Sequence, residues 1–297
     1  MELLPQGIVS GLLIGGIFSI IAMGLAVQFS VMRVINFAQG VFLMLGAYLA
    51  LFLREQFGLD PYLGAFVAFA ALFVVGWFLM GTLLERLLGS DPVLPLIATF
   101  GIAVAVQNLV VATLGAAPRA TTALWSHETL RFGEIIVPVS RIIAFGLAAA
   151  SVVFLVYVVQ YTKMGRFMRA TSSEPVAAAL AGIDVKRVDR FAFGLGCGLA
   201  GFAGAVVLPI FQASPFIGDR FMVNAFVIVL IGGLGSIAGA GIAGLIVGVV
   251  IGVGGLLLPG SLEGALLFVI LIIVMMFRPY GLFGGKREDL IYRSKEH

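Results

Sequence analysis

The sequence predicts an all-α fold, a polytopic bundle of transmembrane helices, and two observations lead to this prediction. The first is composition: 61% of the 297 residues are apolar and 11% are charged, with a mean hydropathy of +1.14. A soluble domain has roughly a quarter of charged residues, so a globule of this composition would lack the polar surface it needs. The second is that the apolar residues form long uncharged blocks, such as Gly7 to Met32 and Phe221 to Leu262. A spanning helix needs about 20 apolar residues, and these blocks are long enough.

We expect a single transmembrane domain over residues 1–297, with eight or nine spans. The predicted spans are 8–30, 35–53, 61–84, 93–115, 138–160, 190–212, 221–235, 237–258 and 262–278. The seventh is short and runs into Gly232-Gly233-Leu234-Gly235-Ser236, and treating it as a re-entrant half-helix gives eight. Asn36 to Gly40 interrupts apolar sequence in a similar way. Broken helices at matched positions in two halves often frame a path through the membrane.

Basic residues at the ends of the apolar blocks predict the orientation. With nine spans and the N-terminus outside, 13 of the 18 Lys and Arg residues lie on the inner side and 5 on the outer side. The positive-inside rule favours this arrangement. It makes the segment 161–190 and the C-terminus cytoplasmic, and it makes the segment 116–137 external.

Glycines recur at every fourth residue in several spans. The glycines with this spacing are Gly244, Gly248 and Gly252, then the pairs Gly11 and Gly15, Gly194 and Gly198, and Gly235 and Gly239. Such a row leaves one helix face without side chains, so that a neighbouring backbone can approach closely. We therefore expect most of these glycines to be contacts between helices.

Several kinds of chemistry are excluded by the residues that are missing. No predicted span has a charged residue near its centre, and His127, in the external segment, is the one histidine besides the C-terminal residue. Coupling to protons through a buried acid or histidine is therefore not expected, while sodium coupling through backbone carbonyls stays open. A P-loop ends in Lys followed by Ser or Thr, whereas Lys286 is followed by Arg287. The single cysteine, Cys197, has no partner for a disulfide or a metal site and is expected to be a buried packing residue. We expect no enzymatic activity, no metal and no cofactor.

Polar residues and glycines inside the apolar blocks are the candidates for a path or gate. They are Asn36, Gln39, Gln107, Asn108, Asn224, Gly232, Gly233, Gly235 and Ser236. Asn36 and Gln39 form a polar pair that can hydrogen-bond a passing carboxylate or an unwound backbone, but Asn36 is equally suited to be the N-cap of the second span. The amides in the fourth and seventh spans must be satisfied away from lipid, either on the path or as bonds between helices.

The inner segment between the fifth and sixth spans contains a short helix of its own. Ser172 or Ser173 suits the N-cap, Glu174 lies in the first turn, where the helix dipole favours an acid, and Gly182 suits the C-terminal end. This pattern predicts a helix over 173–181. The segment is either an ordinary loop in contact with anionic lipid or a docking helix that sits in a groove of a cytoplasmic partner. The residues expected to dock are Ser173, Glu174, Ala177, Ala178 and Gly182.

Four parts of the chain together resemble the permeases of ABC importers. Glu174 to Asp184 resembles the coupling-loop motif of these permeases, with an acid, alanines and a later glycine. The rest resembles the branched-chain amino-acid type of the family. The stretches that carry this second resemblance are Val34 to Gly40 with Leu45 to Tyr48, Gly232 to Ala240, and Phe277 to Gly284. They occur in the expected order over essentially the whole chain.

This resemblance implies a permease subunit of a bacterial inner-membrane importer. Such importers pair two permeases, usually different ones, with two cytoplasmic ATPases, which hydrolyse the ATP, and a periplasmic substrate-binding protein. The helix near Glu174 to Gly182 would be the coupling helix that receives the movement of the ATPases. Many relatives have histidine where this chain has Gln39 and an acid where it has Val41, so urea, short amides and aromatic acids stay open beside branched-chain amino acids. From the residues alone, a stand-alone secondary transporter or channel and a membrane scaffold are the rival classes.

Overall fold

The computed structural model describes residues 3–88, 91, 93–124, 128–132, 135–257 and 263–284, and this part of the chain is mostly helical. Seven of the described helices are long and apolar enough to cross a membrane. They are α1 (Leu3–Met32), α2 (Gln39–Phe57), α3 (Pro61–Thr82, followed by the 3-10 turn η1, Leu84–Arg86), α4 (Val93–Leu114), α5 (Val139–Tyr161), α8 (Val185–Val207) and α10 (Ile237–Leu257). Two shorter helices, α9 (Ile217–Gly232) and α11 (Glu263–Phe277), take the places of the predicted seventh and ninth spans. The all-α transmembrane bundle is therefore confirmed, and the choice between eight and nine spans stays a prediction. His127 and Lys286 lie outside the described residues.

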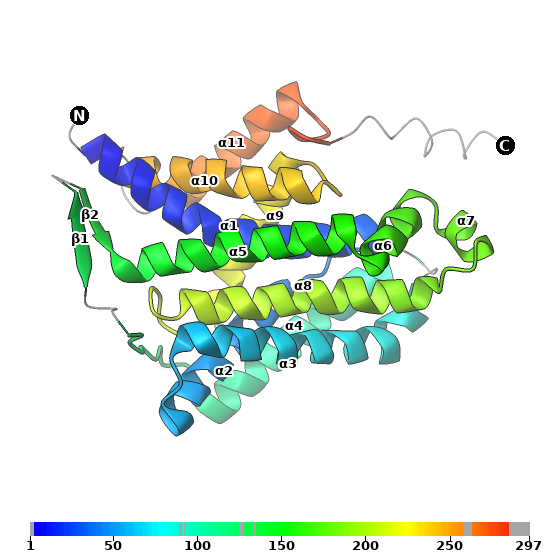
Figure 1. Cartoon of the computed structure of the whole chain (residues 1–297), viewed down its shortest axis with the longest axis horizontal. Coiled ribbons are helices and arrows are strands. Elements are labelled where there is room, and N and C mark those ends of the chain that lie inside the picture. Colours follow the sequence, from blue (N-terminus) through cyan, green and yellow to red (C-terminus); the bar gives the residue numbers. More distant parts are fainter. Residues whose placement is uncertain are drawn as a thin grey trace.

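The two ends of the bundle carry different structures (Figure 1). At one end lies a small antiparallel hairpin of β1 (Thr129–Phe132) and β2 (Ile135–Pro138). At the other end lie two short helices, α6 (Lys163–Ser173) and α7 (Pro175–Leu180). Apart from its last residue, Pro138, the hairpin falls inside the predicted external segment 116–137, in which no strand was predicted. Its position opposite α7 agrees with the prediction that the segments 116–137 and 161–190 face opposite sides of the membrane.

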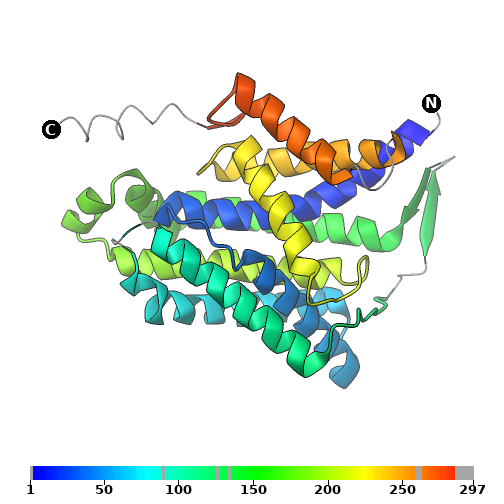
Figure 2. The ribbon, with the colours of Figure 1, turned by 180° about the vertical axis from the view of Figure 1, so that it is seen from behind.

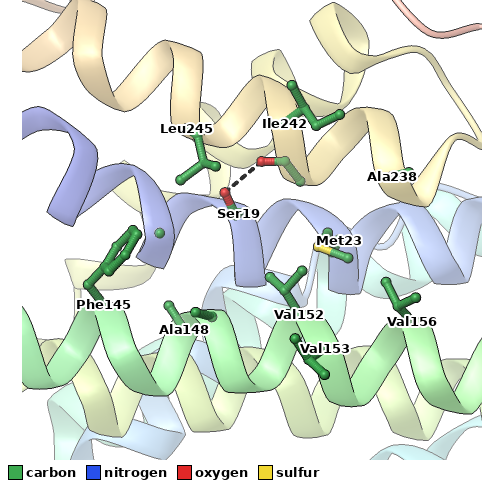
Figure 3. Close-up of a pocket in the computed structure, with 13 residues that line it drawn as sticks. Ser19, Met23, Phe145, Ala148, Val152, Val153, Val156, Ala238, Ile242 and Leu245 are labelled. Atoms are coloured by element: carbon green, nitrogen blue, oxygen red, sulfur yellow. Dashed lines mark hydrogen bonds between the residues drawn. The ribbon is translucent and has the colours of Figure 1, made fainter.

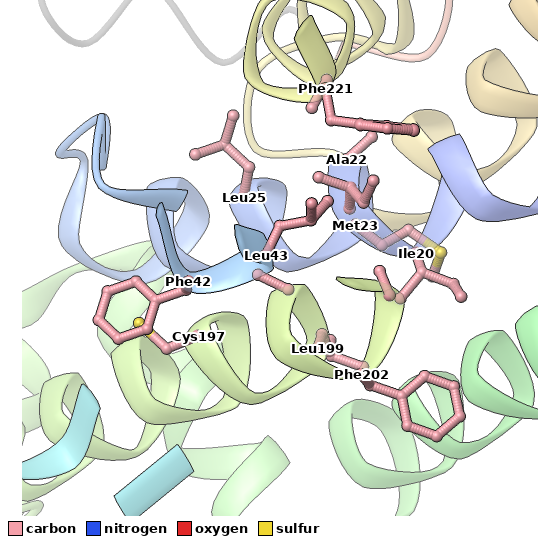
Figure 4. Close-up of a cluster of buried hydrophobic side chains, with 14 of the residues drawn as sticks. Ile20, Ala22, Met23, Leu25, Phe42, Leu43, Cys197, Leu199, Phe202 and Phe221 are labelled. Atoms are coloured by element: carbon pink, nitrogen blue, oxygen red, sulfur yellow. The ribbon is translucent and has the colours of Figure 1, made fainter. Parts of the chain in front are cut away.

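The central helix of the bundle is α8, in which every residue from Ala192 to Val207 is buried. Its glycines let α3 approach closely, because a Cβ at Gly194 would lie 2.9 Å from the carbonyl oxygen of Phe73, and one at Gly198 would lie 3.0 Å from that of Phe69. Figure 4 shows side chains of α1, α2, α8 and α9 meeting in the core. Cys197 is fully buried among them, which confirms the prediction that it is a buried packing residue.

The glycine rows of α1 and α10 pack against each other. A Cβ at Gly11 would lie 2.5 Å from the carbonyl oxygen of Gly248, and one at Gly15 would lie 3.0 Å from that of Gly244. Because residue numbers fall along α10 as they rise along α1, the two helices are antiparallel. These contacts confirm the prediction that most of the spaced glycines join helices, whereas Gly235 lies in the turn before α10 and makes no such close contact.

The first predicted break is a stretch of non-helical chain that separates α1 from α2. Residues 33–38 connect the two helices, and Asn36 within them is 1% exposed. The N-cap of α2 is Ala38, so the alternative in which Asn36 caps the second span is wrong. Asn36 Oδ1 instead accepts a bond from the backbone N–H of Ala38 at 2.9 Å. This bond forms an Asx turn directly before the first residue of α2.

Candidate functional site

Three buried amides from α1, the first break and α2 meet against α8. Asn36 Nδ2 donates to Gln28 Oε1 at 3.1 Å, Gln28 Nε2 donates to the carbonyl oxygen of Phe193 at 3.0 Å, and Gln39 Nε2 donates to that of Gly196 at 3.1 Å. None of the three amide side chains is more than 1% exposed. These bonds tie the broken segment to the backbone of the central helix.

The amide cluster is packed in this conformation and does not line an open path. Gln39 Oε1 has no hydrogen-bond donor among the described residues although it is buried. Movement of α2 along α8 would have to break the bond from Gln39 to the carbonyl oxygen of Gly196. The predicted place of Asn36 and Gln39 beside the path stays a prediction. Sequence reasoning missed Gln28, and the signal was present, because it is the one amide in the uncharged block from Gly7 to Met32.

A second polar site lies where α4 meets the start of α9. Gln107 Nε2 donates to the carbonyl oxygen of Pro215 at 3.1 Å and to Asp219 Oδ2 at 2.9 Å. Asn108 is exposed, and among the described residues its side chain bonds only to the carbonyl oxygen of Val104 in its own helix, at 2.8 Å. Asn224 is half-buried on α9. Gln107 therefore forms a bond between helices, which is one of the two roles predicted for these amides. Asn108 takes no part in this contact.

The second predicted break, between α9 and α10, is closed by the chain that follows α11. Gly233 and Gly235 have positive φ angles of 102° and 85°, which side-chain-bearing residues rarely adopt. The N–H of Leu282 donates to the carbonyl oxygen of Ile231 at 2.7 Å, and the N–H of Phe283 donates to that of Gly232 at 3.1 Å. The carbonyl oxygens in the last turn of α9, which have no partner within that helix, are thus satisfied by a distant segment. Ser236 Oγ accepts a bond from the N–H of Gly239 at 3.1 Å in the first turn of α10.

The predicted helix over 173–181 begins differently in the structure. Ser173 is the last residue of α6, so its predicted role as an N-cap is wrong. Glu174 is the N-cap of α7, with extended backbone at φ −152° and no side-chain capping bond. The reason is Pro175, whose ring disfavours helical backbone at the residue before it. The inner segment is therefore two helices with a sharp break at Glu174.

The end of α7 agrees with the prediction. Gly182 has a φ of +83° and donates its N–H to the carbonyl oxygen of Ala179 at 3.0 Å, while the N–H of Ile183 donates to that of Ala178 at 3.1 Å. These two bonds form a Schellman motif, which ends a helix and needs a residue that tolerates positive φ.

The outer surface of α7 is apolar and uncovered. Leu180 is 86% exposed and Val176, one turn earlier, is 68% exposed. Ala177 is also exposed, whereas Ala178 faces inward and is 5% exposed. Helix α7 thus touches the bundle through one side and offers Val176 and Leu180 on another.

An apolar cavity of about 360 Å³ lies between α1, α5 and α10 (Figure 3). Its walls include Met23, Phe145, Val152 and Ile242. The hydroxyl of Ser19 donates to the carbonyl oxygen of Gly241 at 2.7 Å. None of the residues predicted for the path lines this cavity.

The apolar helices and the two dissimilar ends define a multi-pass membrane protein with a surface helix beyond one end of the bundle. The chain belongs to the family of permease components of branched-chain amino acid transport systems. The model of this family, described as "Branched-chain amino acid transport system / permease component", matches residues 7–275. This membership confirms the predicted class, a transport permease of the ABC type.

Curated relatives match the chain over most of its length. The high-affinity branched-chain amino acid transport system permease protein BraD of Pseudomonas aeruginosa is 28% identical, over 96% of this chain and 97% of its own. The corresponding permease LivH of Escherichia coli is 27% identical over the same shares. A probable branched-chain amino acid transport permease LivH of Methanocaldococcus jannaschii is 30% identical, over 77% of this chain and 74% of its own. No solved structure matches the chain.

Proposed function

We propose that the chain is the permease subunit of an ATP-driven importer that moves branched-chain or related hydrophobic amino acids across the bacterial inner membrane. The family and the substrates named for its relatives support this substrate class. The proposed partners are two cytoplasmic ATPases, a second, homologous permease and a periplasmic substrate-binding protein. The end that carries α7 is cytoplasmic, together with the C-terminus.

The observation that best supports coupling to an ATPase is the exposure of Leu180 on α7. A leucine that is 86% exposed on a short helix beyond the bundle is suited to fill an apolar groove of another protein. Burial of such a side chain contributes about 1.5 to 3 kcal/mol. A cytoplasmic ATPase is the partner expected at this end of an importer permease.

The contacts of α6 and α8 give a route from α7 into the bundle. Thr162 caps α6, since its Oγ1 accepts a bond from the N–H of Gly165 at 3.0 Å. Helix α6 packs closely on α5, because Gly165 lies against the backbone of Val158. On the other side of α7, Asp184 Oδ1 accepts a bond from the N–H of Arg187 at 3.1 Å and caps α8. A displacement of α7 therefore acts on the buried central helix through a short connection.

The test compares two substitutions in the assembled transporter. Leu180→Asp should abolish ATP-dependent uptake of leucine and lower the ATPase activity stimulated by the binding protein, while Leu180→Met retains both. Both variants should insert and unfold like the parent, because the side chain is exposed in the isolated permease. Normal uptake by Leu180→Asp would refute the docking role of α7. Uptake by vesicles that contain the permease without an ATPase would refute the importer and indicate a secondary transporter or channel.

A further inference from the structure

A charged cavity of about 380 Å³ lies where the end of α3 meets the start of α8. It is lined by Trp77, Asp184, Lys186, Arg187 and Arg190. Two of its three basic side chains form ion pairs with Glu85 of η1. Lys186 Nζ lies 3.0 Å from Glu85 Oε1, and Arg190 Nη2 lies 2.5 Å from Glu85 Oε2. Arg187 is exposed and forms no ion pair with the described part of the chain. The cavity therefore keeps a cation available for an anionic ligand.

A row of aromatic rings leads away from this cavity along one face of α3. The ring centroids of Trp77 and Phe73 are 6.2 Å apart, and those of Phe73 and Phe69 are 6.3 Å apart. The rings of Phe73 and Phe69 can lie against α8 because Gly194 and Gly198 of that helix have no side chains. A Cβ at Gly194 would lie 3.4 Å from the ring of Phe73, and one at Gly198 would lie 3.2 Å from the ring of Phe69. All three aromatic side chains are half-buried, so they form an apolar surface track between α3 and α8.

The row ends in an apolar groove of about 390 Å³ between α3, α5 and α8. Phe69 contributes to this groove and meets Phe154 of α5 edge to face, with centroids 5.9 Å apart. The groove is also lined by Leu199 and Phe202 of α8 and by Ala150 of α5. The charged cavity, the aromatic row and the groove form one continuous seam.

The dimensions of the seam identify its occupant. Arg190 and Leu199 are nine residues apart on α8, which is about 14 Å of helix. Half of a bilayer's hydrocarbon core is about 15 Å thick, so a lipid with its headgroup at the cations places an acyl chain in the groove. Basic pockets between spanning helices bind anionic headgroups, and tryptophan prefers the level of the headgroups.

We propose that this seam binds one anionic phospholipid. The phosphate lies at Arg187 and Lys186 beside Trp77, and an acyl chain follows Phe73 and Phe69 into the groove. Because Asp184 lines the same cavity and caps α8, the lipid steadies the junction between α7 and α8. The proposal holds whichever substrate the protein transports.

The test uses Trp77 as a reporter inside the seam. The chain has two tryptophans, Trp77 and Trp125. Trp125→Phe therefore leaves Trp77 as the only tryptophan, whose emission is excited selectively at the red edge of the absorption band. The protein is reconstituted in phosphatidylcholine with increasing fractions of phospholipid brominated on its acyl chains, either phosphatidylglycerol or phosphatidylcholine. We expect half-maximal quenching at a mole fraction at least threefold lower for the anionic lipid.

Matched variants separate the seam from ordinary lipid contact. Lys186→Gln with Arg187→Gln should remove the preference for phosphatidylglycerol, whereas Arg166→Gln, which removes an exposed cation of α6, should retain it. Ala150→Phe should reduce quenching by filling the groove, whereas Ala149→Phe, which faces the cavity beside α1, should not. Equal quenching by both lipids, or a preference that survives the double substitution, would overturn the proposal. Loss of the preference in excess inorganic phosphate would assign the cavity to a free anion and would also overturn it.

Discussion

The side-chain amide of Asn36 donates to Oε1 of Gln28 at 3.1 Å, and its own Oδ1 accepts a bond from the N–H of Ala38 at 2.9 Å. Asn36→Ala removes both bonds and leaves two buried polar groups without partners. We expect a loss of about 2 kcal/mol in the free energy of unfolding, because a buried group left unsatisfied costs about 1–3 kcal/mol. The measurement is the thermal unfolding of the purified protein in detergent.

The control for this substitution is Asn108→Ala. Asn108 is exposed on α4, and its side chain donates to the carbonyl oxygen of Val104 in the same helix. Its removal should change the unfolding temperature little. Equal shifts for the two variants would mean that the amide cluster contributes no more than an exposed amide does.

The helices of the bundle were predictable because a bilayer leaves the backbone little alternative. Every N–H and C=O in the hydrocarbon core must be paired within the chain, so a long uncharged block becomes a helix. The predicted span 138–160 and the observed α5, Val139–Tyr161, differ by one residue at each end. The start of α8 at Val185 was placed five residues too late, because its first turns contain charges that the uncharged-block criterion excluded.

The polar contacts were less predictable because they join residues far apart in sequence. The bond from Gln107 to Asp219 depends on how α4 meets α9, and no local pattern specifies it. Leu282 reaches the carbonyl oxygen of Ile231 for the same reason. The break at Glu174 is different, because it follows from a local signal: Pro175 comes directly after Glu174, and a proline disfavours helical backbone at the residue before it.

The contact between α1 and α10 predicts a strong effect of a small substitution. A Cβ at Gly248 would overlap the backbone of Gly15 and lie 2.5 Å from the carbonyl oxygen of Gly11. Gly248→Val must push the two helices apart, and we expect it to cost several kcal/mol or to prevent folding. The control is Gly255→Val on the same helix, since a Cβ at Gly255 meets no atom within 4 Å. The yield of monodisperse protein and its unfolding temperature distinguish the two variants, and equal behaviour would contradict the packing described.

Gly182 supplies a conformational test of α7. Its φ of +83° is strained for an alanine by about 1–2 kcal/mol, whereas asparagine adopts it more readily. A Cβ there meets no atom within 4 Å, so the strain is the only cost. We expect Gly182→Ala to lower ATP-dependent uptake severalfold with little change in the unfolding temperature, and Gly182→Asn to restore most of it. An equal loss in both variants would show that the backbone angle is not what matters at this position.

The opposite placement of α7 and the β-hairpin predicts their accessibility from the two sides of the membrane. Cys197 is the single cysteine and is fully buried, so the parent protein should not react with a thiol reagent. Ala177→Cys in α7 and Glu128→Cys directly before β1 each place a thiol at an exposed position. Helix α7 and the hairpin lie at opposite ends of the bundle (Figure 1). Because the positive-inside rule puts the basic segment around α7 in the cytoplasm, a membrane-impermeant maleimide added to spheroplasts should label Glu128→Cys and leave Ala177→Cys unlabelled. Inverted membrane vesicles should give the reverse. Labelling of both thiols from one side would contradict the arrangement of the bundle across the membrane, and a reversed pattern would contradict only its orientation.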